Sequence, residues 1–288
     1  MEPRRALTTT VHRPQRHFST WCHYHLRFFD IILLWADDAE DLAALSPLAN
    51  ERIVLRQGAQ IPHVSRLTQT LLRQDANTNA ALEDCQRRQM DWLLHIDDDE
   101  LFRPLDPQLW DQNPEVSQLH FVNHEACPLW SADNPFSAIR HFKKSGRLPF
   151  ILYEGGKSAV RCKIGARADG PHRFSLAEGA GFVSRGAEIL HYGCYSYETW
   201  LRKYLNLGDF SDWYLDDFRT PITKRFHLES RNIIQDCLAT GDFGPSESYF
   251  RQVVWDDEEL LQGRLRGDLL CISDVDVANP SAVNTELT

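Results

Sequence analysis

Apolar positions along the first hundred residues change between the spacing of strands and the spacing of helices. Four short apolar segments are predicted as strands: residues 6–11, 30–36, 52–56 and 92–96. The second of these is almost continuously apolar, which is typical of a strand buried on both faces. Apolar residues with helical spacing occupy 17–29 and 65–90. This alternation predicts an α/β fold with a mostly parallel sheet flanked by helices.

The second half of the chain has a less regular pattern. Residues 119–123 and 189–192 are predicted as strands, and residues 150–162 are predicted as a hairpin. Ser196 can cap a helix that carries Glu198 in its first turn. These elements follow no strict alternation, so this half is expected to form a smaller, irregular part of the same fold.

The last residues lose both aromatic side chains and periodicity. We therefore expect a disordered tail over residues 268–288. Residues 1–267 contain no obvious linker and no internal repeat. The chain length of 288 residues suits one large domain, and a single domain over 1–267 is the prediction.

Charge and cysteine content exclude some classes of protein. The formal net charge of −10 argues against a nucleic-acid partner bound through counterion release. No segment approaches the roughly 18 consecutive apolar residues of a membrane span. The 7 cysteines are scattered and form no CxxC pair, which favours reduced thiols over a disulfide framework. Basic residues near the start precede no hydrophobic signal core, so a soluble, cytoplasmic protein is expected.

Four acidic residues follow the fourth predicted strand directly: Asp97, Asp98, Asp99 and Glu100. Carboxylates packed this closely repel one another, and some must take up protons unless a cation neutralises them. A divalent cation would bind such hard oxygen ligands. Because side chains alternate along an extended backbone, Asp97 and Asp99 share one side and can hold one ion.

Acidic runs are usually solvated loop surface, and this remains the alternative interpretation of the cluster. The apolar segment 92–96 favours a functional one, because a solvated run seldom grows directly out of a core strand. In open α/β sheets, ligands bind just beyond the carboxyl ends of the strands, where these carboxylates fall.

The segment Asp91–Phe102 resembles the DxD-containing strand end of the GT-A glycosyltransferases, most closely those of glycosyltransferase family 92 and its family-2-like relatives. Further similar pieces follow in the order of those families: Trp21–Leu26, Arg73-Gln74 with Asn77 and Asn79, Gly156–Ser158, and His191-Tyr192 with Ser196, Tyr197, Glu198 and Lys203. The resemblance covers residues 6–207. It implies the GT-A fold, a Rossmann-like sheet in which 6–102 bind a nucleotide-sugar and 103–267 bind the acceptor.

The resemblance also implies a metal site and a donor site. Asp97 and Asp99 would approach Mn²⁺ or Mg²⁺ between the two phosphates of a UDP- or GDP-sugar, and His191 would complete the coordination. His172 is a second candidate for that last ligand. The residues placed with the donor are Asp37, Arg73, Asn77, Asp98 and Lys157.

Several of these residues have plainer interpretations that the sequence leaves open. His191 can be an ordinary strand-end histidine, and Lys157 an exposed lysine of a hairpin. Arg73 and Asn77 can belong to the polar surface of their helix. Asp37 has Asp38 beside it, which offers a second residue for the same role. His95 lies within its strand and is expected to be structural.

An inverting transfer needs a carboxylate that deprotonates the acceptor hydroxyl. Glu125, just after the predicted strand 119–123, is the candidate for this base, and Asp133 is its rival. The predicted reaction is displacement of a nucleoside diphosphate from a sugar by the hydroxyl of a glycan, protein or small-molecule acceptor.

Two other functions remain possible from the sequence. One is a metal-dependent phosphohydrolase, although the second set of metal ligands that a two-metal site requires is not evident. The other is a catalytically inactive, carbohydrate-binding protein with a GT-A shell. A dinucleotide-dependent dehydrogenase is disfavoured because no GxGxxG follows the first strand.

Overall fold

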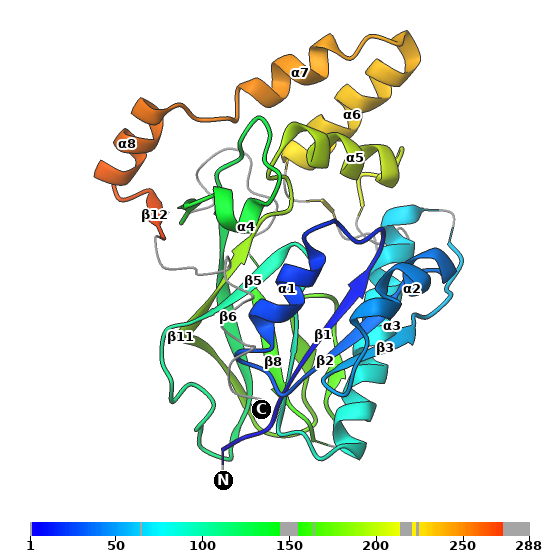
Figure 1. The fold of residues 1–288 in the computed structure, drawn as a ribbon, viewed down its shortest axis with the longest axis vertical. Coiled ribbons are helices and arrows are strands. Elements are labelled where there is room, and N and C mark those ends of the chain that lie inside the picture. The colour runs from blue at the N-terminus through cyan, green and yellow to red at the C-terminus, as the bar shows by residue number, and fades with distance from the viewer. Residues whose placement is uncertain are drawn as a thin grey trace.

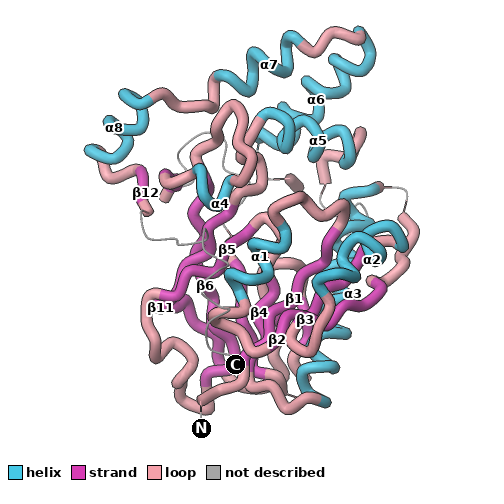
Figure 2. Tube along the Cα trace, viewed as in Figure 1, coloured by secondary structure: helices cyan, strands magenta, loops and turns pink. Residues whose placement is uncertain are grey.

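The structure is a computed structural model that describes residues 2–63, 65–144, 155–163, 165–213, 221–222 and 225–272. One large mixed sheet forms its centre, with helices on both faces and at one end (Figure 1). Figure 2 shows most of the strands in the lower part of the view and the helices α5 to α8 above them, with β12 lying higher, near α8.

The four strands predicted from the first hundred residues form one parallel half of the sheet. They are β1 (Arg5–Val11), β2 (Ile31–Ala36), β3 (Ile53–Gln57) and β4 (Trp92–His95). Their order is β4-β1-β2-β3, and every neighbouring pair is parallel. The predicted α/β fold with a mostly parallel sheet is confirmed.

The other half of the sheet mixes directions. It consists of β5 (Glu100–Pro104), β6 (Val116–Ala126), β7 (His141–Lys143), β8 (Lys157–Arg161), β11 (Ala180–His191) and β12 (Leu269–Cys271). β8 lies antiparallel between β4 and β6. β11 pairs with β6 in parallel and with β5 in antiparallel fashion. A separate two-stranded sheet joins β9 (Arg167–Ala168) and β10 (Phe174–Ser175).

The helices divide into those that cover the sheet and those that form a group at its upper end. The first set is α1 (Phe18–His25), α2 (Ala39–Leu45), a short 3₁₀ turn (Ser46–Leu48) and α3 (Arg66–Arg87). The second set is α4 (Pro135–Ala138), α5 (Tyr197–Leu207), α6 (Arg225–Thr240), α7 (Gly244–Arg251) and α8 (Asp257–Leu265).

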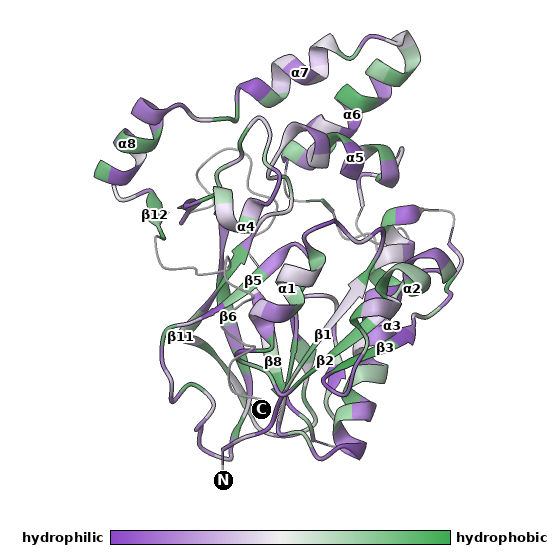
Figure 3. Ribbon diagram, viewed as in Figure 1, coloured by the Kyte–Doolittle hydropathy of each residue, from purple (hydrophilic) through white to green (hydrophobic). Residues whose placement is uncertain are grey.

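The central strands are apolar throughout because both faces of the sheet are covered. In β2, Ile32 and Leu34 point into a core cluster with residues of α1, whereas Ile31 and Leu33 point into a second cluster with residues of α3. Figure 3 shows β2 as a predominantly hydrophobic (green) strand. Burial of both faces explains why 30–36 reads as one continuous apolar run.

A third core lies outside the sheet, among α5, α6 and α7. Trp200 and Tyr204 of α5 pack there with Ile234 of α6 and Phe250 of α7. Ser196 caps α5 as predicted, in a reciprocal capping box with Thr199. The structure thus places the N-terminus of α5 beside the sheet and its apolar side against the upper helices.

Some sequence expectations need correction. The strand predicted at 189–192 is the end of the much longer β11, and β5 follows the acidic run without being predicted. The tail predicted from 268 begins too early, because Leu269–Cys271 form β12 and Leu269 is buried beside α8. Residues 273–288, like residues 150–154 of the predicted hairpin, lie outside the described residues.

The expectations about membrane spans and about the cysteines can be compared with the structure directly. None of the helices in the described ranges is long and apolar enough to cross a membrane. All seven cysteines are free thiols, and five of them are buried.

His25 of α1 illustrates a histidine held neutral by its surroundings. Its Nδ1 lies 2.9 Å from the Trp21 carbonyl oxygen, while Nε2 accepts a hydrogen bond from the Phe102 N–H at 3.1 Å. Only a neutral imidazole, with one N–H and one lone pair, can make both bonds. Burial lowers the pKa of His25 to about 3.

We expect His25 to make the folded protein sensitive to acid. Between about pH 6.5 and 3, His25 is protonated in the unfolded chain but stays neutral in the folded chain. The unfolding free energy should therefore fall with falling pH in this window, by up to about 1.4 kcal/mol per pH unit from this residue.

Urea titrations at pH 7, 6 and 5 should show a smaller dependence of the unfolding free energy on pH for His25→Gln. His23→Gln, at an exposed position of the same helix, should keep the slope of the unaltered protein. Equal slopes in all three proteins would contradict the assignment.

Candidate functional site

The carboxyl ends of β1, β2 and β4 meet at one edge of the sheet, and a cavity of about 620 Å³ lies there. We call it the large cavity. Its walls include residues at and after the ends of these three strands, one side of α3, residues of α5 and the segment that contains His172. The volume lies within the range of about 300–1,000 Å³ common for small-molecule sites, and the position is that of ligand sites in open α/β sheets.

A second cavity of about 210 Å³, the small cavity, adjoins the first. It lies between the loop before α1, residues 192–195 and α5. The two cavities share six lining residues: His12, Arg13, Asp98, Asp99, Lys203 and Asn206. A molecule in one cavity and a molecule in the other would therefore meet at Asp98 and Asp99.

Asp97 is bound by cationic and polar side chains of the protein itself. Lys157 Nζ of β8 lies 2.6 Å from Asp97 Oδ2 and 3.4 Å from Glu100 Oε2, and Gln74 Nε2 donates to Asp97 Oδ1 at 2.8 Å. Lys157 is 0% exposed. Although burial lowers the pKa of a lysine, the charges of Asp97 and Glu100 outweigh it and raise the pKa of Lys157.

Asp99 faces His191, and the pairing of three strands explains why. In the sheet register His191 of β11 is the partner of Glu100 in β5 and of Glu125 in β6. His191 Nδ1 lies 2.9 Å from Glu125 Oε2, and its Nε2 lies 3.6 Å from Asp99 Oδ1. Burial lowers the pKa of His191, but the carboxylates of Glu125 and Asp99 outweigh this and raise it to about 10.

Asp98 lacks such a partner among the described residues and lines both cavities. Burial, followed by the charges of Asp99 and Asp97, raises its pKa well above the usual value. Burial also raises the pKa of Glu100, to about 7, although Lys157 opposes the shift. The acidic run therefore contains two carboxylates that share a lysine, one that faces a histidine, and one without an ion pair that lines both cavities.

This arrangement changes the electrostatic argument made from the sequence. The repulsion within the acidic run was expected to require a metal ion or bound protons. The fold brings two cationic side chains, Lys157 and His191, to the run from strands 60 or more residues away. The charge of the run alone is thus no longer an argument for a metal.

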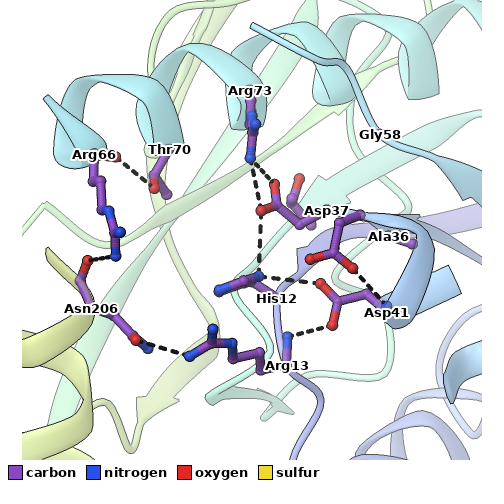
Figure 4. A network of polar contacts seen from close by, with 12 residues as sticks. His12, Arg13, Ala36, Asp37, Asp41, Gly58, Arg66, Thr70, Arg73 and Asn206 are labelled. Atoms are coloured by element: carbon purple, nitrogen blue, oxygen red, sulfur yellow. Dashed lines mark hydrogen bonds and ion pairs between the residues drawn. The ribbon is translucent and has the colours of Figure 1, made fainter. Parts of the chain in front are cut away.

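Asp37 belongs to a polar network at the end of β2 (Figure 4). Arg73 Nη1 donates to both carboxylate oxygens of Asp37 at 2.7 Å. His12 Nδ1 lies 3.3 Å from Asp37 Oδ2 and 3.2 Å from Asp41 Oδ2. Asp38 caps α2 by accepting from the Asp41 N–H. The structure therefore assigns Asp38 to the helix and places Asp37 on the wall of the large cavity.

Among the described residues, one group of three has donor atoms mutually close enough for a metal ion: His12, Asp37 and Asp41. Its oxygen atoms already accept hydrogen bonds from Arg73, from His12 and from the Arg13 N–H. The guanidinium beside Asp37 would also repel a divalent ion. The group fits a hydrogen-bonded connection between β1, β2 and α3 better than a metal site.

Arg13 has a strained backbone at the junction of the cavities. Its φ is 52°, in the left-handed region that residues other than glycine adopt at a cost of about 1–2 kcal/mol. Its N–H donates to Asp41 Oδ1 at 2.7 Å, and its Nη1 donates to Asn206 Oδ1 at 3.1 Å. Such strain clusters at functional sites, which supports a role for this corner of the molecule.

Other residues singled out from the sequence lie elsewhere. Asn77 is buried, accepts from the Ala59 N–H and donates to Thr10 Oγ1, so it joins strand ends and lines neither cavity. Glu125 is buried behind His191 and also lines neither cavity. The side chain of Asp133 is 95% exposed and pairs with Arg16. Lys157 is a core residue rather than an exposed lysine of a hairpin.

The two remaining histidines support the wall of the large cavity. His95 is buried, as expected for a structural residue, and its Nδ1 lies 3.1 Å from the Pro171 carbonyl oxygen. His172 lines the large cavity with Pro171, and its Nδ1 lies 2.9 Å from the Gly156 carbonyl oxygen. Burial lowers the pKa of His172 to about 3.

Four residues of the cavity walls were not predicted from the sequence: His12, Arg13, Arg202 and Asn206. His12 and Arg13 directly follow the first predicted strand, and the rule that ligands bind at carboxyl strand ends could have found them. Arg202 and Asn206 lie on α5, and only the tertiary structure brings that helix to the cavities.

We expect Lys157→Met to destabilise the protein strongly, because it leaves the Asp97 carboxylate without its buried cation. Removing one partner of a buried ion pair costs roughly 3–5 kcal/mol of unfolding free energy. Chemical denaturation measures the change. Lys144→Met, at an exposed position, should alter the value by at most about 0.5 kcal/mol. Combining Lys157→Met with Asp97→Asn should restore part of the loss. A loss that Asp97→Asn does not relieve would mean that Lys157 stabilises the fold by packing alone.

No protein-family model matches the chain. A glycosyltransferase-like protein of Arabidopsis thaliana is 25% identical over an alignment of 234 residues, which covers 69% of this chain and 49% of the relative. A second one from the same plant is 24% identical over 229 residues, covering 69% of this chain and 43% of the relative. The chain spans less than half the length of either relative.

Among solved structures, a mannose-1-phosphate geranyltransferase from Thermus thermophilus aligns with 86% of this chain and 68% of its own. The identity is 9% and the TM-score 0.29, and so weak a likeness carries no argument about function. The resemblance to family 92 stays a prediction. What the comparisons establish is that the chain is similar to glycosyltransferase-like proteins over about two thirds of its length.

Proposed function

We propose that this protein is a glycosyltransferase of the GT-A type that transfers a sugar, such as a hexose, from a nucleoside-diphosphate-sugar to an acceptor hydroxyl. The observation that carries the proposal is the pair of adjoining cavities whose common wall contains Asp98 and Asp99. A transferase must hold two substrates so that their reacting atoms meet. A hydrolase needs one substrate cavity and access for water.

The large cavity is the proposed donor site. It lies where the carboxyl ends of parallel strands meet, the usual place for a nucleotide in an α/β sheet. Asp37, held by Arg73, can accept hydrogen bonds from the nucleoside. Lys203 lines both cavities and has no hydrogen-bond or ion-pair partner among the described residues. Its charge can stabilise the leaving diphosphate.

Two of the residues that would hold a divalent cation such as Mn²⁺ or Mg²⁺, Asp99 and His191, face each other. Asp99 Oδ1 is a buried acceptor with no hydrogen-bond partner among the described atoms, and His191 Nε2 lies 3.6 Å from it. Glu125 orients the ring of His191, as carboxylates behind metal-bound histidines do, and a cation at Nε2 would displace the proton that Glu125 and Asp99 stabilise on the ring. Asp97 would be the third ligand, but its side chain would have to turn toward the other two, because the structure does not bring ligand atoms of all three residues within the mutual distance of a metal site. A bound cation would neutralise charge that develops on the diphosphate.

The base in an inverting reaction must lie within hydrogen-bond reach of the acceptor hydroxyl. Glu125 was predicted for this role from the sequence, and it lies behind His191 rather than on a cavity wall. Asp98 lines both cavities and is the carboxylate that geometry favours. Glu125 then acts as a positioning residue for His191.

The proposal can be tested with UDP- and GDP-sugars in the presence of Mn²⁺, Mg²⁺ or EDTA, by measuring nucleoside diphosphate release. We expect release of one nucleoside diphosphate that depends on the cation. Asp99→Asn should reduce it at least about a hundredfold, since a metal contributes several kcal/mol to such transition states. Asp111→Asn, at an exposed position outside both cavities, should have no effect.

The proposal would be wrong if no nucleotide-sugar binds, with or without cation. Release of phosphate from simple phosphoesters would then favour the phosphohydrolase. Binding of sugars without any turnover would favour a catalytically inactive, carbohydrate-binding protein.

The roles of Glu125 and Asp98 can be separated by comparing Glu125→Gln with Asp98→Asn. Glu125→Gln should weaken cation affinity about 10–100-fold, as loss of a supporting carboxylate does, and saturating cation should restore most of the turnover. Asp98→Asn should reduce kcat for transfer roughly a hundredfold or more, as loss of a base does, and saturating cation should not restore it. Unchanged cation affinity with a lost kcat in Glu125→Gln would instead identify Glu125 as the base.

A further inference from the structure

Arg202 is the distinctive residue of the small cavity. Nine residues line this cavity without lining the large one, and Arg202 is the one among them with a permanent charge. The side chain comes from the second turn of α5, on the side of the helix that Thr199 and Asn206 also present to the cavity. It therefore faces the part of the cavity that a donor would leave free.

The guanidinium of Arg202 has no hydrogen-bond or ion-pair partner within the described part of the chain. Glu198, one turn earlier on α5, is exposed, lies outside the cavity walls and forms no ion pair with it. Asp133 pairs with Arg16, and Asp98 and Asp99, which line the same cavity, form no ion pair with Arg202. A guanidinium offers five donors in a planar fork that matches carboxylate and phosphate oxygens. A partly buried guanidinium without a partner is suited to bind an anion.

The other residues of the small cavity include neutral polar groups and aromatic rings. His17 is 8% exposed, and its Nδ1 is buried without a hydrogen-bond partner among the described atoms. Burial, with the charges of Arg16 and Arg202, lowers the pKa of His17 to about 4, so the imidazole stays neutral. Gln15 accepts from Tyr195 Oη at 3.1 Å, which leaves its amide N–H₂ as a donor. Phe136 and Tyr195 pack edge-on around His17.

Side chains of opposite charge lie in different parts of the small cavity. Asp98 and Asp99 lie on the wall shared with the large cavity, where a base is needed. Arg202 lies among the residues that the large cavity does not touch. A neutral acceptor could accept hydrogen bonds from this guanidinium but would leave its charge unpaired. An acceptor with a negative group would be oriented by it, with a hydroxyl toward Asp98.

We infer that the small cavity binds the acceptor and that the acceptor carries an anionic group, a carboxylate or a phosphate, bound by the guanidinium of Arg202. That the bound molecule is an acceptor of sugar rests on the proposed function. The anion site itself stands on the geometry of the small cavity.

The test uses three methyl glycosides that differ at one position: methyl β-glucuronide, methyl β-glucoside 6-phosphate and the neutral methyl β-glucoside. Binding of each to the full chain without nucleotide is measured by calorimetry or ligand-observed NMR. We expect the unaltered protein to bind at least one charged glycoside roughly tenfold or more tightly than the neutral one, as charge-assisted hydrogen bonds imply. The two charged probes distinguish a carboxylate from a phosphate ligand.

Arg202→Gln should abolish the preference for the charged probe and leave the affinity for the neutral one unchanged. Arg202→Lys should keep part of it, because the charge remains while the fork is lost. Arg225→Gln on α6, whose side chain is 89% exposed and pairs with Glu229, is the control and should keep the full preference. Thermal unfolding of each variant checks that the fold is intact.

The outcomes separate this inference from the proposed function. Equal affinities for all three probes, or no binding of either charged probe at millimolar concentration, would overturn the anionic site even if nucleotide-sugars are turned over. Equal loss of charged and neutral probes in Arg202→Gln would also overturn it. A charge preference that depends on Arg202, found without any turnover of nucleotide-sugars, would keep the anion site and remove the transferase.

Discussion

The site depends on the neutralisation of a run of four acidic residues at the end of a buried strand. Asp97 and Glu100 share the buried ammonium of Lys157, and Asp99 faces the imidazole of His191. Without these cations, the carboxylates would repel one another in a partly desolvated place. The topology of the sheet meets this requirement, since β8 lies beside β4 and β11 lies between β5 and β6. The insertion of an antiparallel strand next to β4 is therefore an electrostatic feature as well as a topological one.

The same arrangement leaves one carboxylate uncompensated at the place where the two cavities join. Asp98 forms no ion pair among the described residues, although the charge of Lys203 opposes the rise of its pKa, and it lines both cavities. On one side lie the parallel strand ends and α3, and on the other lie α5 and the loop before α1. The rigid sheet holds the acidic run, while α5 brings Arg202 and Lys203 to it. α5 can do so because Trp200 and Tyr204 anchor it in a core of its own.

Much of the first half of the fold was predictable, and particular residues show why. The run Ile31–Ala36 is apolar at every position because both faces of β2 are covered, and no helix boundary interrupts it. The second half was less predictable because its long strands, β6 and β11, contain polar residues that other strands satisfy. His191 and Glu125 are adjacent only through the register of β11 with β6, which no local pattern encodes. Leu269–Cys271 is three residues long, too short for a periodic signal.

For the candidate site, the sequence by itself determined that acidic side chains would gather beyond the fourth strand, because strand ends of a parallel sheet meet at one edge. It also indicated which residues come close to them: Asp37, Arg73, Lys157 and His191. Only the tertiary structure decided how each is used. Asn77 became a buried link between strand ends, and Lys157 became an internal counter-ion. Glu125 became the support of His191, because long-range pairing of strands, and not local sequence, sets which charges share a buried space.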